Sequence, residues 1–381
     1  MSTLQRGASR ACASCRWRGA LLTAVAAMFA GVVGCNSQGA SSSGGSSLST
    51  VSSSANVATV NGTPITQADF YQQLQTYRPQ QNPMGGMDTE PAGVVVLREL
   101  IQTQLLEQLA KKDGVYPADA QVDQGYQDLQ LQDTSTSVKP LDQQLQEDGL
   151  SPDLVKQNQI VPQLCQLNEV SKGITVTDAD VKAYYDLHKS EPQFTLPDQV
   201  HLKRIVCNTQ ADATALYNQL QKGGTWDAAY NSPQSVNKTF PDGDFPNWIS
   251  LNNMTNPQAK PLFDALKATD AGKYAPPVKL ENQFWVIQVV EKRAGQTYSL
   301  DKVSNLIKDQ LLNQKAMTDP SKAGAFQAAM RDKATTADIK VNESQYQPLV
   351  QQITNPAPPA PMMAPPTPAP GGAPAPPAPK Q

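Results

Sequence analysis

The stretch from residue 200 to residue 293 decides the fold of this chain. It opens with VHLKRIVC (200–207), an apolar run typical of a strand, and it closes with a second apolar run, FWVIQVV (284–290). Between the two lie an amphipathic helical pattern (213–220), a short helical segment (226–230), a Gly-Asp turn (241–248) and a further helical segment (262–266). Strand, helix, short helix, turn, helix and strand in this order predict a small α+β domain.

This order of elements resembles the parvulin-type (PpiC) peptidyl-prolyl isomerase domain, and the likeness covers the whole stretch. In that family the first strand carries a histidine, and its spacing to the aromatic residue that opens the next short helix matches the spacing from Arg204 to Trp226. The closing strand QFWVI (283–287) matches the strand of the family's second histidine and places Trp285 at that position. The turn DGDF (242–245) matches the family's Gly-Gly-Asp-Leu. The resemblance therefore implies that Arg204 and Trp285 replace both family histidines.

The chain contains two histidines, and neither stands at a family position. His201 precedes Arg204 on the same predicted strand, and His188 lies on the apolar side of an earlier helical pattern, where we expect a packed or half-exposed side chain. A third catalytic position of the family, a cysteine, aspartate or serine, falls in the segment 232–238. That segment contains no cysteine or carboxylate and offers Ser232, Ser235 and Asn237.

The resemblance also implies which side chains form the binding slot. An isomerase needs no nucleophile or metal, because a dry apolar slot that binds the twisted prolyl amide better than the planar forms is sufficient. The family builds this slot from Met and Phe side chains. Met254 and Phe263 fall near those positions, and Phe245 and Trp248 are expected to add apolar wall. Ordinary core packing is the alternative for each of the four.

Antiparallel pairing of the two strands, as in parvulins, makes Arg204 and Trp285 neighbours. A guanidinium over an indole face contributes about 0.5–2 kcal/mol. An arginine does not titrate, so it cannot take a role that depends on a histidine tautomer. A buried guanidinium needs an acceptor, which we expect to be Asp242 or Asp244. We therefore predict a structural Arg204–Trp285 pair. The resemblance implies a prolyl isomerase, whereas the two replacements predict weak activity or none.

The first 34 residues have the composition of a lipoprotein signal peptide. They carry four arginines and no acidic residue, and a short apolar run (20–33) leads into Cys35. This run is too short to span a bilayer and ends in small residues, as secretory signals do. A cysteine after Val-Val-Gly resembles a bacterial lipobox, which implies acylation of Cys35; ordinary cleavage beside an incidental cysteine is the alternative. A Ser/Gly-rich tether (35–54) follows, so we expect an extracytoplasmic protein that is lipid-anchored to a bacterial membrane.

Composition argues against several classes of function. The formal net charge of the 381 residues is −3 and becomes more negative without the basic leader, so no nucleic-acid partner is expected. No zinc-ligand spacing, P-loop or dinucleotide-binding glycine pattern occurs in the body of the chain, so no metal and no cofactor are expected. Cys165 and Cys207 lie among apolar residues, which favours buried thiols over a disulfide.

The regions on both sides of the α+β stretch are predicted to be mainly helical. VATVNGTPIT (57–66) indicates a strand with an Asn-Gly turn, followed by a helix that Thr66 caps, and this opening resembles the N-terminal segment of PrsA- and SurA-type extracytoplasmic foldases. A helix that begins at Ser151 contains Pro162, which predicts a kink. After two further helical patterns, residues 339–341 indicate an edge strand.

We therefore expect an α+β fold class, in which N- and C-terminal segments build a helical SurA/PrsA-like chaperone domain and a parvulin-like α+β domain is inserted between them. The expected parts are a lipoprotein signal peptide (1–34), a Ser/Gly-rich tether (35–54), an N-terminal helical chaperone module (55–175), a connecting helix (176–197), the parvulin-like domain (198–294), C-terminal helices that pack on the N-terminal module (295–350) and a Pro/Ala-rich disordered tail (351–381).

Three functions are compatible with this organisation. The leading hypothesis is a membrane-anchored foldase or chaperone whose partners are unfolded or nascent exported polypeptides, with the membrane contacted through acylated Cys35. The first alternative is an active prolyl isomerase with an atypical pocket. The second is a non-chaperone envelope scaffold, in which the parvulin-like domain docks one fixed partner. A homodimer is an open alternative to a monomer.

Overall fold

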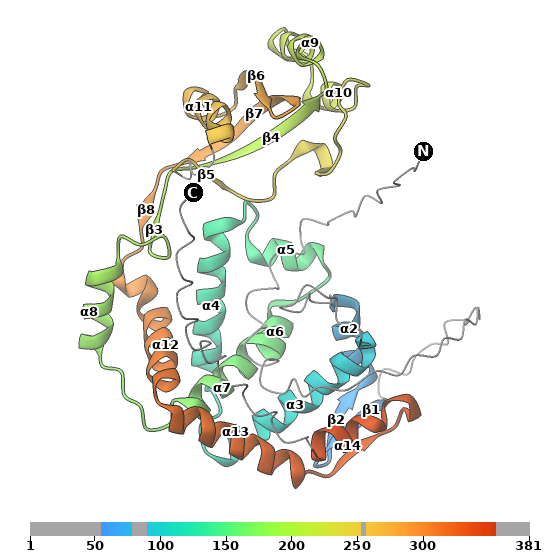
Figure 1. Cartoon of the computed structure of the whole chain (residues 1–381), viewed down its shortest axis with the longest axis vertical. Coiled ribbons are helices and arrows are strands. Elements are labelled where there is room, and N and C mark those ends of the chain that lie inside the picture. The colour runs from blue at the N-terminus through green and yellow to red at the C-terminus, as the bar shows by residue number, and fades with distance from the viewer. Residues whose placement is uncertain (1–54, 78–89, 253–256, 356–381) are drawn as a thin grey trace, which may run out of the picture. The chain divides into compact units, whose positions relative to one another are not determined.

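The computed structural model describes residues 55–77, 90–252 and 257–355 of the chain (Figure 1). The described residues divide into two compact units, one from 99 to 334 and one that joins 55–98 to 335–355. Helices and sheets are mixed, as predicted. None of the helices within these ranges is long and apolar enough to cross a membrane. Cys35, Met254 and the proline-rich segment from 356 lie outside the described residues.

Both ends of the chain contribute strands to one small sheet. Strand β1 (Asn56–Val60) pairs with β2 (Thr63–Thr66) on one side and with β9 (Ile339–Val341) on the other, antiparallel in both cases. The Asn-Gly turn between β1 and β2 has φ values of 50° and 80°, which a tight two-residue hairpin requires. The strand predicted at 339–341 is confirmed, and it lies at the sheet edge.

Three helices and a short 3₁₀ turn complete this unit. Helix α2 (Gln67–Thr76) begins at Thr66, whose hydroxyl accepts the Asp69 amide at 3.1 Å, so the predicted cap is confirmed. The first residues of α3 (Ala92–Lys112) follow, and Ser344–Tyr346 leads to α14 (Pro348–Thr354). The disordered tail was expected to begin at 351, but α14 continues to Thr354 because Leu349 and Ile353 are buried.

The larger unit begins with a group of helices. After α3 come α4 (Asp119–Thr136), α5 (Leu141–Glu147), α6 (Pro152–Val155), a π-helical turn (Lys156–Ile160) and α7 (Val161–Val170). The expected irregularity at Pro162 takes the form of this π turn, because proline has no N–H for the preceding ladder. Helices α8 (Asp178–His188), α12 (Leu300–Thr318) and α13 (Pro320–Thr335) come from later in the chain.

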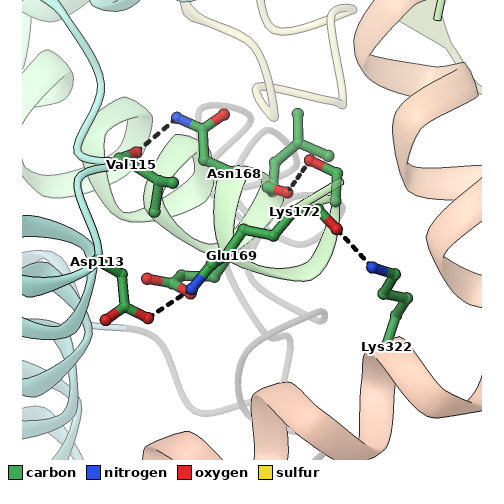
Figure 2. A network of polar contacts seen from close by, with 8 residues as sticks. Asp113, Val115, Asn168, Glu169, Lys172 and Lys322 are labelled. Carbon is green, nitrogen blue, oxygen red and sulfur yellow. Dashed lines mark hydrogen bonds and ion pairs between the residues drawn. The ribbon is translucent and has the colours of Figure 1, made fainter. Parts of the chain in front are cut away.

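A polar network joins three of these helices, as Figure 2 shows. Lys172, just after α7, pairs with Asp113 at the end of α3 (2.5 Å) and with Glu169 (3.3 Å), and its carbonyl accepts a bond from Lys322 of α13. Asn168 donates to the Val115 carbonyl at 2.9 Å. Burial raises the pKa of Glu169. Helices far apart in the sequence are thus held together by specific bonds.

The stretch from 199 to 293 forms an antiparallel sheet with the strand order β5-β4-β7-β6. Its strands are β4 (Gln199–Cys207), β5 (Ile249–Ser250), β6 (Tyr274–Leu280) and β7 (Gln283–Arg293). Helices α9 (Gln210–Gln221) and α10 (Trp226–Tyr230) pack with Ile205 and Val286 on one face, and α11 (Lys260–Ala268) packs with Ile287 on the other. A two-stranded ribbon of β3 (Thr195–Leu196) and β8 (Gln296–Thr297) precedes and follows this part.

Candidate functional site: an arginine among aromatic rings

The register of β4 and β7 brings the two predicted site residues together. Arg204 pairs with Ile287, and Val206 pairs with Trp285, so Arg204 and Trp285 are diagonal neighbours. Both lie on the sheet face that α11 covers, because residues two apart on a strand point to the same side. The Arg204 Cζ atom lies 4.1 Å from the centre of the Trp285 ring. The predicted contact between these two side chains is therefore present.

Two further aromatic rings surround the guanidinium. The Arg204 Cζ atom lies 4.8 Å from the Phe245 ring centre and 5.4 Å from that of Phe240, and these two rings are 4.7 Å apart. We call Arg204, Phe240, Phe245 and Trp285 the Arg204 cage. The arginine is half-buried, and this loss of solvent lowers the pKa of Arg204. The guanidinium remains a cation at neutral pH, because the ordinary pKa of arginine is far above 7.

A loop from 231 to 245 supplies two of the cage rings, and helix α10 holds it. The Tyr230 hydroxyl donates to the Phe240 carbonyl at 2.7 Å, and the Trp226 indole donates to the Asp242 carbonyl at 2.9 Å. Gly243 has a φ of 67°, and a Cβ atom there would lie 2.2 Å from the Arg204 carbonyl. Glycine at this position lets the loop pass directly against β4.

The expected acceptor for Arg204 is wrong. Asp242 pairs with Lys203, and Asp244 Oδ1 lies 2.6 Å from His201 Nε2, so neighbours on β4 engage both carboxylates. Lys203 and Arg204 are adjacent on a strand and point to opposite sides, which separates their partners. Among the described residues, no carboxylate or other hydrogen-bond acceptor contacts the Arg204 guanidinium, and desolvation is the one cause of its lowered pKa.

The other slot candidates separate into two groups. Phe263 belongs to the buried core on the α11 side of the sheet, and Phe245 and Trp285 pack against that core. Trp248 lies elsewhere: its ring centre is 4.1 Å from Arg293 Cζ and 6.0 Å from the His201 ring, edge to face. The prediction that Trp248 lines the same slot thus has no support from its contacts. Phe240 was missed, since only the path of the loop brings it to Arg204.

The polar residues of the segment 232–238 serve the loop itself. Ser232 donates to the Ala229 carbonyl at 2.7 Å, and Asn237 accepts the Thr239 amide at 2.9 Å. Ser235 is buried and accepts a bond from Lys238 at 2.9 Å. None of these contacts resembles a nucleophile beside a base. Within the described ranges, no group of acidic, histidine and cysteine side chains is arranged to hold a metal.

Both cysteines of the described chain are free and buried, as predicted. Burial raises the pKa of Cys165 to about 12 and that of Cys207 to about 11. The reactive form of cysteine is the thiolate, so neither side chain is a nucleophile at neutral pH. The candidate site therefore offers aromatic surface and one positive charge.

Comparison with protein families agrees with the predicted order of domains. Residues 176–305 match the family model described as the PPIC-type PPIASE domain, and residues 13–160 match the model of the SurA-like N-terminal domain. The chain thus combines a parvulin-type peptidyl-prolyl isomerase domain with a SurA-like N-terminal domain. The resemblance to PrsA- and SurA-type foldases with a PpiC domain, and the α+β fold class, are therefore confirmed.

Several named proteins are similar to this chain over most of its length. It is 25% identical to the foldase protein PrsA of Clostridium perfringens strain 13, over 76% of this chain and 87% of that protein. It is 23% identical to the putative peptidyl-prolyl cis-trans isomerase YacD of Bacillus subtilis strain 168, over 70% of this chain and 80% of that one. The solved structure of PrsA from Bacillus subtilis matches 77% of this chain and 96% of its own, with 20% identity and a TM-score of 0.24.

Proposed function

We propose that this protein is an extracytoplasmic foldase that binds unfolded exported polypeptides at the Arg204 cage of its PPIC-type domain. The named relatives, a PrsA foldase and a peptidyl-prolyl isomerase, support the class of function. The observation that carries the proposal is the cage itself. It presents three half-buried aromatic rings, to which extended apolar chains bind by losing water from both surfaces.

The same observation argues for weak prolyl isomerase activity. Arg204 and Trp285 occupy the positions where the family resemblance expects histidines, and neither side chain exchanges a proton near neutral pH. The apolar wall of Phe245, Phe263 and Trp285 is retained. Binding of a prolyl segment is thus supported, while the polar groups that would favour the twisted amide are replaced.

The test compares two activities of the full-length protein. We expect it to suppress aggregation of an unfolded client while the isomerisation rate of a short X-Pro peptide stays near background. Trp285→Ala should weaken suppression, because it removes one wall of the cage. Trp248→Ala is the matched control, since it removes an equally close Arg–Trp contact away from the cage.

Two results would change the proposal. If Trp285→Ala protected the client as well as the wild type, the cage would not be the client site. Peptide turnover well above background that Phe263→Ala or Met254→Ala removed would favour the active isomerase. Capture of one fixed partner, without protection of unfolded clients, would favour the envelope scaffold.

We also propose that acylation of Cys35 anchors the protein to a bacterial membrane. The support is the sequence of the leader, with its basic start, short apolar run and cysteine after Val-Val-Gly. Several acyl chains hold a protein at a bilayer, at about 0.8 kcal/mol per buried CH₂. Cys35→Ser should move the protein from the membrane fraction to the soluble fraction and abolish labelling by a fatty-acid analogue. Unchanged labelling would contradict the assignment to Cys35.

A further inference from the structure

The Arg204 guanidinium differs from the other buried or half-buried arginines of the described chain in having no acceptor. Arg98 donates to the Glu90 carboxylate at 2.7 Å, and Arg293 donates to Gln199 and to two backbone carbonyls. Arg331 is exposed, so water serves it. Arg204 is half-buried and contacts aromatic rings, which attract a cation but accept few hydrogen bonds.

This arrangement leaves a charge partly desolvated and without hydrogen-bonded compensation. A guanidinium has five N–H donors, and no nitrogen of Arg204 is both fully buried and without a partner, so its donors remain accessible to a ligand. The two acidic side chains of the loop that passes against β4, Asp242 and Asp244, are already engaged by Lys203 and His201. The loop that carries them therefore excludes its own carboxylates from the cage.

We propose that Arg204 receives a carboxylate of the bound polypeptide, so that the cage selects segments in which a carboxylate lies beside proline or another apolar residue. The inference rests on the proposed client-binding function and names the chemistry of the segment that binds. A carboxylate matches the planar fork of a guanidinium with two parallel hydrogen bonds, which a neutral carbonyl cannot supply. The adjacent apolar residue packs on Phe245 and Trp285, whose rings already contact the arginine.

The carboxylate has two sources, an acidic side chain or the end of a chain, and three peptides distinguish them. The first contains Glu-Pro and ends in an amide, the second contains Gln-Pro and ends in an amide, and the third contains Gln-Pro and ends in a free carboxylate next to an apolar residue. We expect the full-length protein to bind at least one carboxylate peptide about tenfold more tightly than the Gln-Pro amide. The preference should shrink at high salt, because ions screen a partly exposed pair.

Two variants at one position and a control test the role of the guanidinium. Arg204→Gln should bind all three peptides with the affinity that the wild type has for the Gln-Pro amide. Arg204→Lys should keep part of the preference, since it keeps the charge and loses the fork. Arg293→Gln, which alters the other Arg–Trp contact, should keep the whole preference. Circular dichroism of each variant shows whether it folds. If a variant does not fold, the salt dependence of peptide binding by the wild type still tests the inference.

The outcomes separate this inference from the proposed function. If wild-type protein binds the three peptides equally well, the carboxylate inference is wrong and the client-binding function stands. A preference that survives in Arg204→Gln would also overturn it, since another group would then hold the carboxylate. If no peptide binds and no client is protected, the proposed function itself fails.

Discussion

Two arginines of this protein stack on tryptophans at the same distance, but one forms hydrogen bonds with acceptors and the other does not. Arg204 lies 4.1 Å from Trp285, and Arg293 lies 4.1 Å from Trp248. The Arg293 guanidinium donates to Gln199 at 2.6 Å and to the carbonyls of Thr134 and Ser135. The Arg204 guanidinium has three rings around it and no acceptor among the described residues. An arginine whose donors are satisfied holds the fold, whereas one whose donors are free is available to a ligand.

The Arg293 surroundings show what a satisfied pair achieves. The carbonyls it bonds belong to the end of helix α4, where the helix's own amides leave them without partners. The Trp248 amide donates to the Thr136 carbonyl at 2.8 Å, and Gln199 donates to the Ser135 carbonyl at 3.0 Å. The last carbonyls of α4 thus accept hydrogen bonds from residues of the β4–β7 sheet region.

The largest effect that we predict follows from removing this arginine. Arg293→Met should lower the free energy of unfolding of the larger unit by about 2–3 kcal/mol, because three charge-assisted bonds are lost and the Oε1 atom of the buried Gln199 loses its donor. Urea denaturation followed by tryptophan fluorescence measures the change. Arg331→Met on the surface of α13 is the control and should have little effect. A loss as small as that of the control would contradict the structural role of Arg293.

The sequence predicted the strands of the cage well and its loop poorly. Alternating apolar residues and the spacing from Arg204 to Trp226 were sufficient to place Arg204 and Trp285 on paired strands. Phe240 was not foreseen, since its position depends on bonds from Tyr230 and Trp226 to backbone carbonyls, which leave no pattern in the sequence. The partners of Asp242 and Asp244 depend on the same loop geometry and were predicted wrongly.

Outside the cage, prolines and short elements limited the prediction. Strand β6 contains Pro276 and Pro277, which argue against a strand; it is tolerated because β6 lies at the sheet edge and its pairing shifts between Ala275 and Val278. Helix α14 is too short to show a helical period, so its last residues, 351–354, were assigned to the tail. Caps with side-chain bonds, such as Thr66 and Ser151, were predicted correctly because they depend on neighbours three residues away.

The Asp309 carboxylate is a second partly buried charge. Unlike the Arg204 guanidinium, it can be neutralised by taking up a proton. Burial and, to a smaller extent, the nearby Asp128 carboxyl on α4 together raise the pKa of Asp309 on α12 to about 6. Burial also raises the pKa of Asp128, which is 7% exposed. The folded state therefore holds protons that the unfolded state releases. Stability from this pair is full below the unfolded pKa of about 4 and is lost as pH rises through about 6.

Asp309→Asn should remove the loss of folding stability that occurs as pH rises through about 6. We expect the variant to be about 1–2 kcal/mol more stable than wild type at pH 7.5 and nearly equal to it at pH 4, as measured by urea denaturation at both values. Asp301→Asn, at an exposed position of the same helix, should show no such gain. Equal stability of Asp309→Asn and wild type at pH 7.5 would mean that the pair is solvated well enough to stay charged without cost.

The smallest predicted effect belongs to Arg204, which cannot release its charge as Asp309 does. Arg204→Met removes cation–π contacts that stabilise the fold, and it also removes a half-buried guanidinium whose donors lack acceptors. These contributions oppose each other, so we expect the free energy of unfolding to change by less than about 0.5 kcal/mol. Arg293→Met, measured in the same denaturation series, provides the contrast. A loss for Arg204→Met as large as that for Arg293→Met would mean that both arginines serve the fold alike, and the distinction between a structural pair and a ligand-binding one would no longer hold.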